Sequence, residues 1–154
     1  MADRQNEIST LNSLISTLID SINGYQDAAA NSEAGRFQQI FRDRANERQK
    51  IAEDLRTEVR RLGGEPETGG SFMGKTHQAW LGLKAAITGR DDKAIVDEVE
   101  RGEDYLKERF ETALGGGDLG GESRTAVERC YQSVKSAHDQ ISQLKHGMEA
   151  PTHS

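Results

Sequence analysis

Apolar residues recur along this chain at alternating spacings of three and four, the pattern of amphipathic α-helices. One stripe consists of Ile8, Leu11, Ile15, Leu18, Ile22, Tyr25 and Ala29. A second stripe consists of Phe37, Phe41, Ile51, Leu55, Val59 and Leu62. Ser32 is placed to cap the second helix, and Gly63-Gly64 is placed to end it. The stripes predict two helices of about 28 to 30 residues, joined by a tight turn into an antiparallel hairpin.

The C-terminal half predicts a second hairpin. Its stripes run over residues 95–113 and 127–144, and the glycine-rich segment 115–121 is a flexible connection between them. A shorter helix, capped by Ser71 and extending to Ile87, carries the chain from one hairpin to the other. We therefore expect an all-α, four-helix bundle of two long antiparallel hairpins with an extra short crossover helix. Residues 1–148 form a single domain in this prediction, and residues 149–154 form a flexible tail.

Composition narrows the range of partners and compartments. The net charge is −6, which argues against nonspecific binding to nucleic acid or to an anionic membrane. No apolar run approaches the roughly 20 residues of a membrane span. Cys130 is the single cysteine, so no internal disulfide can form. The polar N-terminus is unlike a secretory signal, and we expect a cytoplasmic protein.

One segment matches a nucleotide-binding motif by its letters alone. Residues 69–76, from Gly69 to Thr76, fit the phosphate-binding pattern G-x-x-x-x-G-K-[ST]. That chemistry needs a strand before the loop and a helix after it, so that backbone amides surround the phosphates. Here the preceding segment has the pattern of a helix, and no parallel sheet is predicted. We therefore expect no nucleotide binding and interpret the segment as a glycine-rich entry to a helix.

The feature of the sequence that bears most on function is the presence of polar residues within the apolar stripes. Charged and hydrogen-bonding side chains fall on or beside the faces that should be buried: Asp20, Tyr25, Arg44, Glu47, Arg48, Glu100, Glu103, Tyr131 and His138. A buried charge is tolerated only when it is paired with an opposite charge or bound to a metal. The stripes therefore predict either a polar layer of ion pairs or a metal site in the core.

The metal interpretation follows from the chemistry of helical bundles. Di-iron and di-manganese bundles use one glutamate from each of two helices and a Glu-x-x-His pair from each of the other two. This chain has Glu47-x-x-Lys50 and Glu128-x-x-Tyr131, and both lack the histidine. A complete ferroxidase centre is therefore not expected. A partial site for iron or manganese would draw its ligands from Asp20, Glu47, Glu100, Glu103 and His77.

The alternative interpretation is purely structural. Arg44 and Arg48 can form ion pairs with Asp20, Glu47 and Glu103, which would neutralise a polar layer without a metal. His77 and Trp80 share one face of the short helix, and two readings of this pair stay open. In the first, His77 is a ligand or acid–base group and Trp80 covers it. In the second, Trp80 anchors the crossover helix and His77 is a hydrogen-bonded partner of a buried carboxylate.

The chain also resembles a known family. The matching segments are Leu18-Ile19-Asp20, Gly24-Tyr25, Ala28-Ala29, Glu47-Arg48, Leu55, Leu62-Gly63-Gly64-Glu65-Pro66, Gly70-Ser71, His77, Trp80 and Glu100-Arg101-Gly102-Glu103-Asp104. They are similar to bacterial ferritin-like four-helix-bundle proteins that contain a domain of unknown function, within the rubrerythrin and ferritin-like superfamily. The resemblance covers residues 5–115 well and the last helix more weakly. It implies a ferritin-like bundle and a homo-oligomer, with a dimer expected.

Three functional hypotheses follow from the residues and the resemblance together. The first is a stress-associated homo-oligomer that is non-enzymatic or weakly metal-binding. The second is a di-metal oxidase or peroxidase that uses iron or manganese. The third is a helix-bundle module for protein interactions, in which the loop 115–121 permits helix exchange between subunits. Fold alone does not choose among them.

Overall fold

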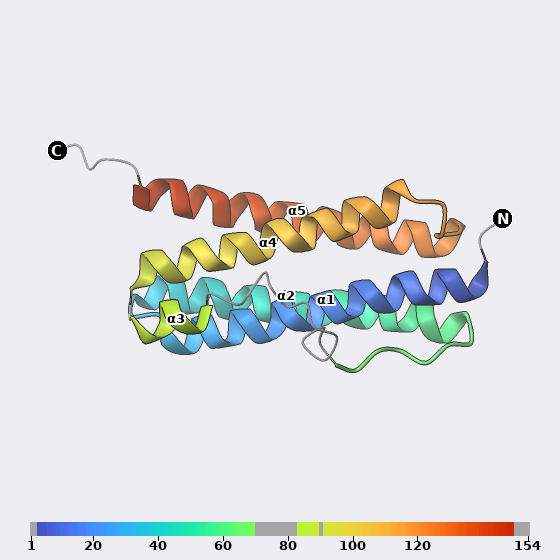
Figure 1. Cartoon of the computed structure of the whole chain (residues 1–154), viewed down its shortest axis with the longest axis horizontal. Coiled ribbons are helices and arrows are strands. Elements are labelled where there is room, and N and C mark those ends of the chain that lie inside the picture. The colour runs from blue at the N-terminus through green and yellow to red at the C-terminus, as the bar shows by residue number, and fades with distance from the viewer. Residues whose placement is uncertain (1–2, 70–82, 90, 150–154) are drawn as a thin grey trace.

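The computed structural model describes residues 3–69, 83–89 and 91–149. This part of the chain contains four long helices and one short one: α1 (Arg4–Asn31), α2 (Gly35–Arg61), α3 (Leu83–Thr88), α4 (Asp92–Gly115) and α5 (Gly121–Glu149). α1 and α2 form one antiparallel hairpin, and α4 and α5 form the other (Figure 1). The predicted all-α bundle of two hairpins with a short additional helix is confirmed.

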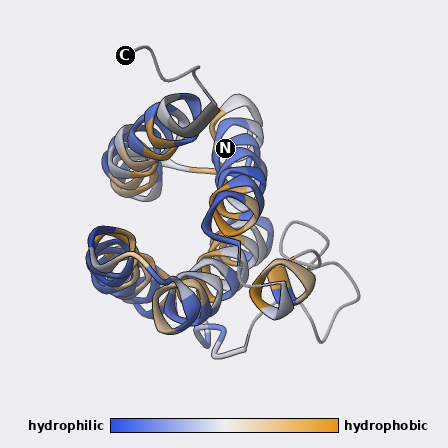
Figure 2. Cartoon of the chain, turned by 90° about the vertical axis from the view of Figure 1, so that its left-hand side faces the viewer, coloured by the Kyte–Doolittle hydropathy of each residue, from blue (hydrophilic) through white to orange (hydrophobic). Residues whose placement is uncertain are grey.

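The two hairpins pack so that neighbouring helices run antiparallel. α1 packs against α4 and α2 packs against α5, while α3 contacts α1 and α4 from outside the four long helices (Figure 2). α2 ends at one end of the bundle and α4 begins at the other, so the chain between them crosses the length of the bundle (Figure 1). A single long crossover of this kind distinguishes one class of four-helix bundle from the simple up-and-down class.

The start of the crossover is attached to α1. The Asn12 side chain donates to the Glu65 carbonyl at 3.0 Å and accepts from the Glu67 amide at 2.8 Å. Ser16, one turn further on, donates to the Gly69 carbonyl at 3.2 Å. Polar residues on the outer face of α1 therefore satisfy the backbone groups of a segment that has no secondary structure of its own.

The turn between α1 and α2 differs from the prediction for Ser32. The Ser32 hydroxyl donates back to the Ala28 carbonyl at 2.8 Å, so it completes the end of α1 and does not cap α2. The amides of Glu33 and Ala34, just before α2, donate instead to the Asp92 carboxylate of α4. The predicted cap at Ser32 is wrong because α2 begins at Gly35, so its N-cap position is Ala34, which makes no side-chain capping hydrogen bond.

The connection between α4 and α5 is also more ordered than its glycine content suggests. Leu119 is buried in the core, and the Gly120 amide donates to the buried carboxylate of Glu7 on α1 at 2.8 Å. These two contacts hold the beginning of α5 against the beginning of α1. The prediction that segment 115–121 is a flexible connection therefore does not describe Leu119 and Gly120, because these contacts hold them in place.

α2 ends as the glycine pair predicts. Gly63 has a φ of +85°, its amide donates to the Arg60 carbonyl at 2.9 Å, and the Gly64 amide donates to the Val59 carbonyl at 2.9 Å. This is a Schellman motif, which satisfies the last carbonyls of the helix and requires a left-handed residue. A Cβ atom at Gly64 would lie 2.9 Å from Ile8 Cγ2, so the second glycine allows the turn to approach α1 closely.

We expect Gly63→Ala to lower the free energy of unfolding by about 1–2 kcal/mol, because an L-side chain at positive φ clashes with its own backbone. Urea denaturation followed by circular dichroism measures the change. Gly117→Ala is the matched control, since Gly117 has no atom within 4 Å of the added Cβ and no positive φ. Equal stability of the Gly63→Ala variant and the wild type would contradict the proposed role of the left-handed turn.

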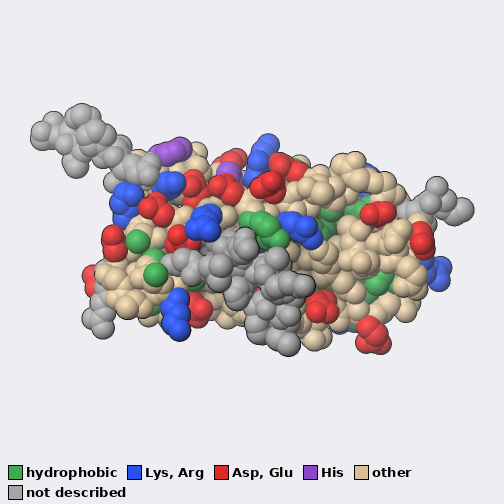
Figure 3. Space-filling view, viewed as in Figure 1, with side chains coloured by type: hydrophobic (Ala, Val, Ile, Leu, Met, Phe, Trp, Pro, Cys, Tyr) green, Lys and Arg blue, Asp and Glu red, His purple; other side chains and the backbone are tan. Residues whose placement is uncertain are grey.

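No helix in the described ranges is both long and apolar enough to cross a membrane. On the face shown in Figure 3, acidic and basic side chains are interspersed, and hydrophobic side chains reach the surface only in small separate areas. Mixed charge of this kind is typical of a solvated helix surface.

Candidate functional site

The core of the bundle is divided into two apolar clusters. One contains Leu11, Leu18, Leu55, Leu106 and Val134, and the other contains Phe41, Val99 and Ile141 among its members. On each long helix, the change from one cluster to the other falls near the middle. The residues at this level are polar: Ser21 and Tyr25 on α1, Arg48 on α2 and Glu103 on α4. We call this set the polar centre.

The polar centre is built around one ion pair. Arg48 and Glu103 are both 0% exposed, and they form two hydrogen bonds, from Nη1 to Oε1 at 2.7 Å and from Nη2 to Oε2 at 2.5 Å. Arg48 Nη1 also donates to the Ser21 hydroxyl at 2.6 Å. The bidentate geometry matches the planar guanidinium to both carboxylate oxygens, which is the arrangement that best offsets the desolvation of two charges.

Tyr25 completes the centre from α1. The Arg48 guanidinium carbon lies 5.5 Å from the centroid of the Tyr25 ring, within the range of a cation–π interaction. Burial raises the pKa of the Tyr25 phenol well above its ordinary value, and the adjacent negative charge of Glu103 raises it further. Burial alone would lower the pKa of Arg48, but Glu103 more than compensates, and the net pKa is raised. The centre therefore holds a neutral phenol beside the Arg48–Glu103 ion pair.

A second line of polar contacts joins α4 to α5. His138 Nε2 lies 2.5 Å from the Asp104 carboxylate, and its Nδ1 lies 3.3 Å from Asp139. Lys145 donates to Glu100 at 2.8 Å, one turn along α4 from Asp104. Burial alone would raise the pKa of Glu100, but the hydrogen bonds from Lys145 and Ser142 lower it. These groups are partly exposed and stabilise the second hairpin at the level of the polar centre.

The predicted ligand residues lie in different environments. Glu103 is held by Arg48, and Glu100 is held by Lys145. Glu47 lies 3.7 Å from Arg44, and its side chain is 35% exposed. Asp20 is buried on α1 beside Ser21. His77 and Trp80 lie outside the described residues, as do residues 70–76 of the phosphate-binding pattern.

The described residues do not fit a di-metal site. Within ranges 3–69, 83–89 and 91–149, no three His, Cys, Asp or Glu side chains are grouped so that they could hold a metal ion. Both oxygens of Glu103, the most deeply buried of the candidate ligands, accept hydrogen bonds from an arginine. The structure instead joins Arg48 to Glu103, one of the pairs expected in the structural interpretation of the stripes. Because His77 is not described, the metal interpretation stays a prediction.

Residues 6–116 match the protein family described as Domain of unknown function (DUF2383). The match covers more than half of the chain and extends from α1 to the end of α4. This chain belongs to the DUF2383 family. No curated protein matches it.

The extent of the match agrees with the sequence pattern. The resemblance to proteins that carry a domain of unknown function covers residues 5–115, and the DUF2383 match has nearly the same limits. The matched range contains all four residues of the polar centre, so the ion pair belongs to the family domain. α5 lies outside the match and supplies the histidine and lysine that bind α4.

Some residues of the site do not stand out in the sequence. Ser21 lies on the same three–four stripe as Leu18 and Tyr25, and this position is the signal that could have identified it as a buried partner. Asp104 has no such signal, because it is exposed and pairs with His138 across 34 residues. Burial raises the pKa of the Cys130 thiol to about 12, so this cysteine is a core residue and not a reactive thiol.

We predict that Arg48→Met and Glu103→Leu each lower the free energy of unfolding by about 3–5 kcal/mol, because each leaves a buried charge without its partner. The double variant should recover most of this loss, since it removes both charges. Guanidinium denaturation of the wild type, the two single variants and the double variant measures the coupling energy between Arg48 and Glu103. The half-exposed pair Arg44 and Glu47 is the control, and its removal should cost about 0–1 kcal/mol. A stable Glu103→Leu single variant would contradict the assignment.

We predict that His138 stabilises the protein most at low pH. Burial alone would lower its pKa, but the hydrogen bonds to Asp104 and Asp139 raise the net pKa. A raised folded-state pKa means that this stabilisation is complete below the unfolded pKa of about 6.5 and is lost as pH rises through the folded value. The loss of melting temperature in His138→Gln should therefore be larger at about pH 5.5 than at about pH 8.5. His146→Gln, an exposed position of α5, is the control. An equal loss at both pH values would exclude the pairing.

Proposed function

We propose that this protein is a non-enzymatic or at most weakly metal-binding member of the ferritin-like bundles, acting as a small homo-oligomer in a stress-associated role. The observation that carries the non-enzymatic part is the Arg48–Glu103 ion pair. In a di-metal bundle, the carboxylates at the middle of the core are the ligands of the metal. Here a guanidinium takes both oxygens of the central carboxylate.

The ferritin-like part of the proposal is supported by the topology. A four-helix bundle with one long crossover connection is the arrangement of ferritin-like folds, and this chain has its crossover between α2 and α4. The homo-oligomeric and stress-associated parts rest on the resemblance of the sequence to ferritin-like bundle proteins. The alternatives, a di-metal oxidase or peroxidase and a protein-interaction module, are outcomes of the same experiment.

The first measurement is metal content by elemental mass spectrometry. The protein is expressed in medium supplemented with iron and manganese, and it is purified without chelators or a histidine tag. We expect far less than one metal ion per chain, and no consumption of peroxide or oxygen above the buffer rate. Near-stoichiometric iron or manganese, lost in Glu47→Gln but kept in the exposed control Glu108→Gln, would overturn the proposal in favour of the oxidase.

Light scattering at micromolar concentration tests the oligomeric part separately. A stable dimer or larger homo-oligomer is the expected result. A monomer would contradict this part of the proposal, and it would leave the metal result unaffected. Specific capture of a second protein by the monomer would favour the interaction module.

A further inference from the structure

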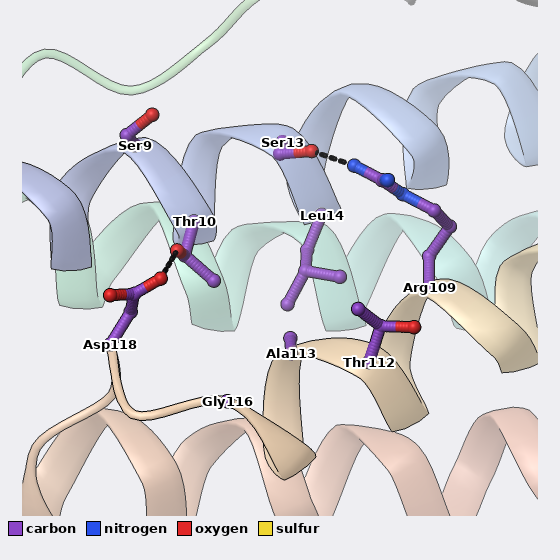
Figure 4. A pocket seen from close by; sticks show the side chains of 9 residues that line it. All are labelled: Ser9, Thr10, Ser13, Leu14, Arg109, Thr112, Ala113, Gly116 and Asp118. Atoms are coloured by element: carbon purple, nitrogen blue, oxygen red, sulfur yellow. Dashed lines mark hydrogen bonds between the residues drawn. The ribbon is translucent and has the colours of Figure 1, made fainter.

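A small polar hollow lies between the first half of α1 and the C-terminal end of α4, well away from the polar centre. Its volume is about 220 Å³. It is lined by Ser9, Thr10, Ser13 and Leu14 from α1 and by Arg109, Thr112, Ala113, Gly116 and Asp118 from the end of α4 and the following segment (Figure 4). The lining combines apolar carbon with hydroxyl groups and two opposite charges.

Arg109 is the unusual group of the hollow. Its Nη2 donates to the Ser13 hydroxyl, and its Nε is buried without a hydrogen-bond partner. None of the ion pairs within the described part of the chain includes Arg109, whereas Arg44, Arg48 and Arg61 each pair with a carboxylate. A partly buried guanidinium that meets only a neutral hydroxyl lacks the counter-charge that usually offsets its desolvation. This geometry makes the Arg109 guanidinium suited to bind the carboxylate of a ligand.

Asp118 occupies the other end of the hollow. In Figure 4 it points toward Thr10, whose hydroxyl donates to it at 3.5 Å, and Leu14 and Ala113 lie between it and Arg109. Asp118 takes part in none of the ion pairs in the described residues. It follows the C-terminal end of α4, which is capped at Gly116 and carries the negative end of the helix dipole. This end of the hollow therefore favours a positive charge.

We propose that this hollow binds a small zwitterion whose two charges stand at the ends of a short apolar chain, such as a short ω-amino acid. The carboxylate of the ligand would pair with Arg109, its ammonium group with Asp118, and its short apolar part would contact Leu14 and Ala113. The hydroxyls of Ser13 and Thr112 supply further hydrogen bonds. The volume is below the roughly 300 Å³ at which pockets for drug-sized ligands begin, so the site selects for size as well as charge. The proposal is independent of the proposed function above.

The test is a titration of the full ¹⁵N-labelled chain with ω-amino acids of increasing length, from β-alanine to 6-aminohexanoate, followed by amide NMR shifts. Acetate, methylammonium and inorganic phosphate are called half-probes here, because each carries charge of only one sign. We expect at least one amino acid to shift the amides of Ser13 and Arg109, with saturation at millimolar concentration, and each half-probe to bind roughly tenfold more weakly. No saturable shift with any amino acid up to about 10 mM would overturn the proposal.

Three variants separate ligand recognition from a structural role of the arginine. Arg109→Gln and Asp118→Asn should each weaken binding roughly tenfold or more, because each removes a charge-assisted hydrogen bond. Arg101→Gln makes the same change at an exposed position of α4 and should bind like the wild type. Asp118 is exposed, so its variant tests the site even where Arg109→Gln fails to fold. Phosphate or acetate binding as tightly as any amino acid, and unaffected by Asp118→Asn, would overturn the zwitterion in favour of a simple anion site.

Discussion

The ion pair between Arg48 and Glu103 is the constraint on which the arrangement of the bundle depends. Two fully buried charges on helices from different hairpins must meet with correct geometry, or each carries an uncompensated desolvation cost. The pair therefore sets how α2 and α4 lie relative to each other along the bundle axis. Ser21 and Tyr25 bring α1 into the same layer, so three helices share one register. A purely apolar interface would tolerate a shift by one turn far more readily.

The ends of the bundle are held by polar contacts of a different kind. At one end, Asp92 of α4 accepts from the amides before α2, and at the other, Glu7 of α1 accepts from the amide before α5. Each carboxylate satisfies backbone groups that have no partner within a helix. The start of the crossover, residues 65–69, is fixed to α1 by Asn12 and Ser16. The hairpins are thus joined through side chains at both ends and in the middle.

The polar centre and the hollow differ in what they can do. In the centre, each charge has a partner within the chain, and the arrangement is closed to solvent. In the hollow, Arg109 and Asp118 line the same space, and neither forms an ion pair with another of the residues that the structure describes. The charges of the centre are therefore satisfied within the chain, whereas the binding proposal rests on two charges that line a space of suitable size.

The periodicity of the sequence determined the number and order of the long helices, the helix-ending glycines at Gly63-Gly64, and the presence of buried polarity at Arg48 and Glu103. These follow from local rules, because spacing along a helix decides which residues share a face. Tertiary structure alone decided the partners. Ser21, Arg48 and Glu103 lie far apart in the chain, and the pairing of Arg48 with Glu103 and not Asp20 depends on the register between hairpins. The same holds for Asp92, which accepts from the amides of the turn before α2, and for Arg109, which donates to Ser13 of α1. A sequence pattern shows which residues share one face of a helix, but it does not give the distances between helices. These contacts therefore form only when the hairpins pack.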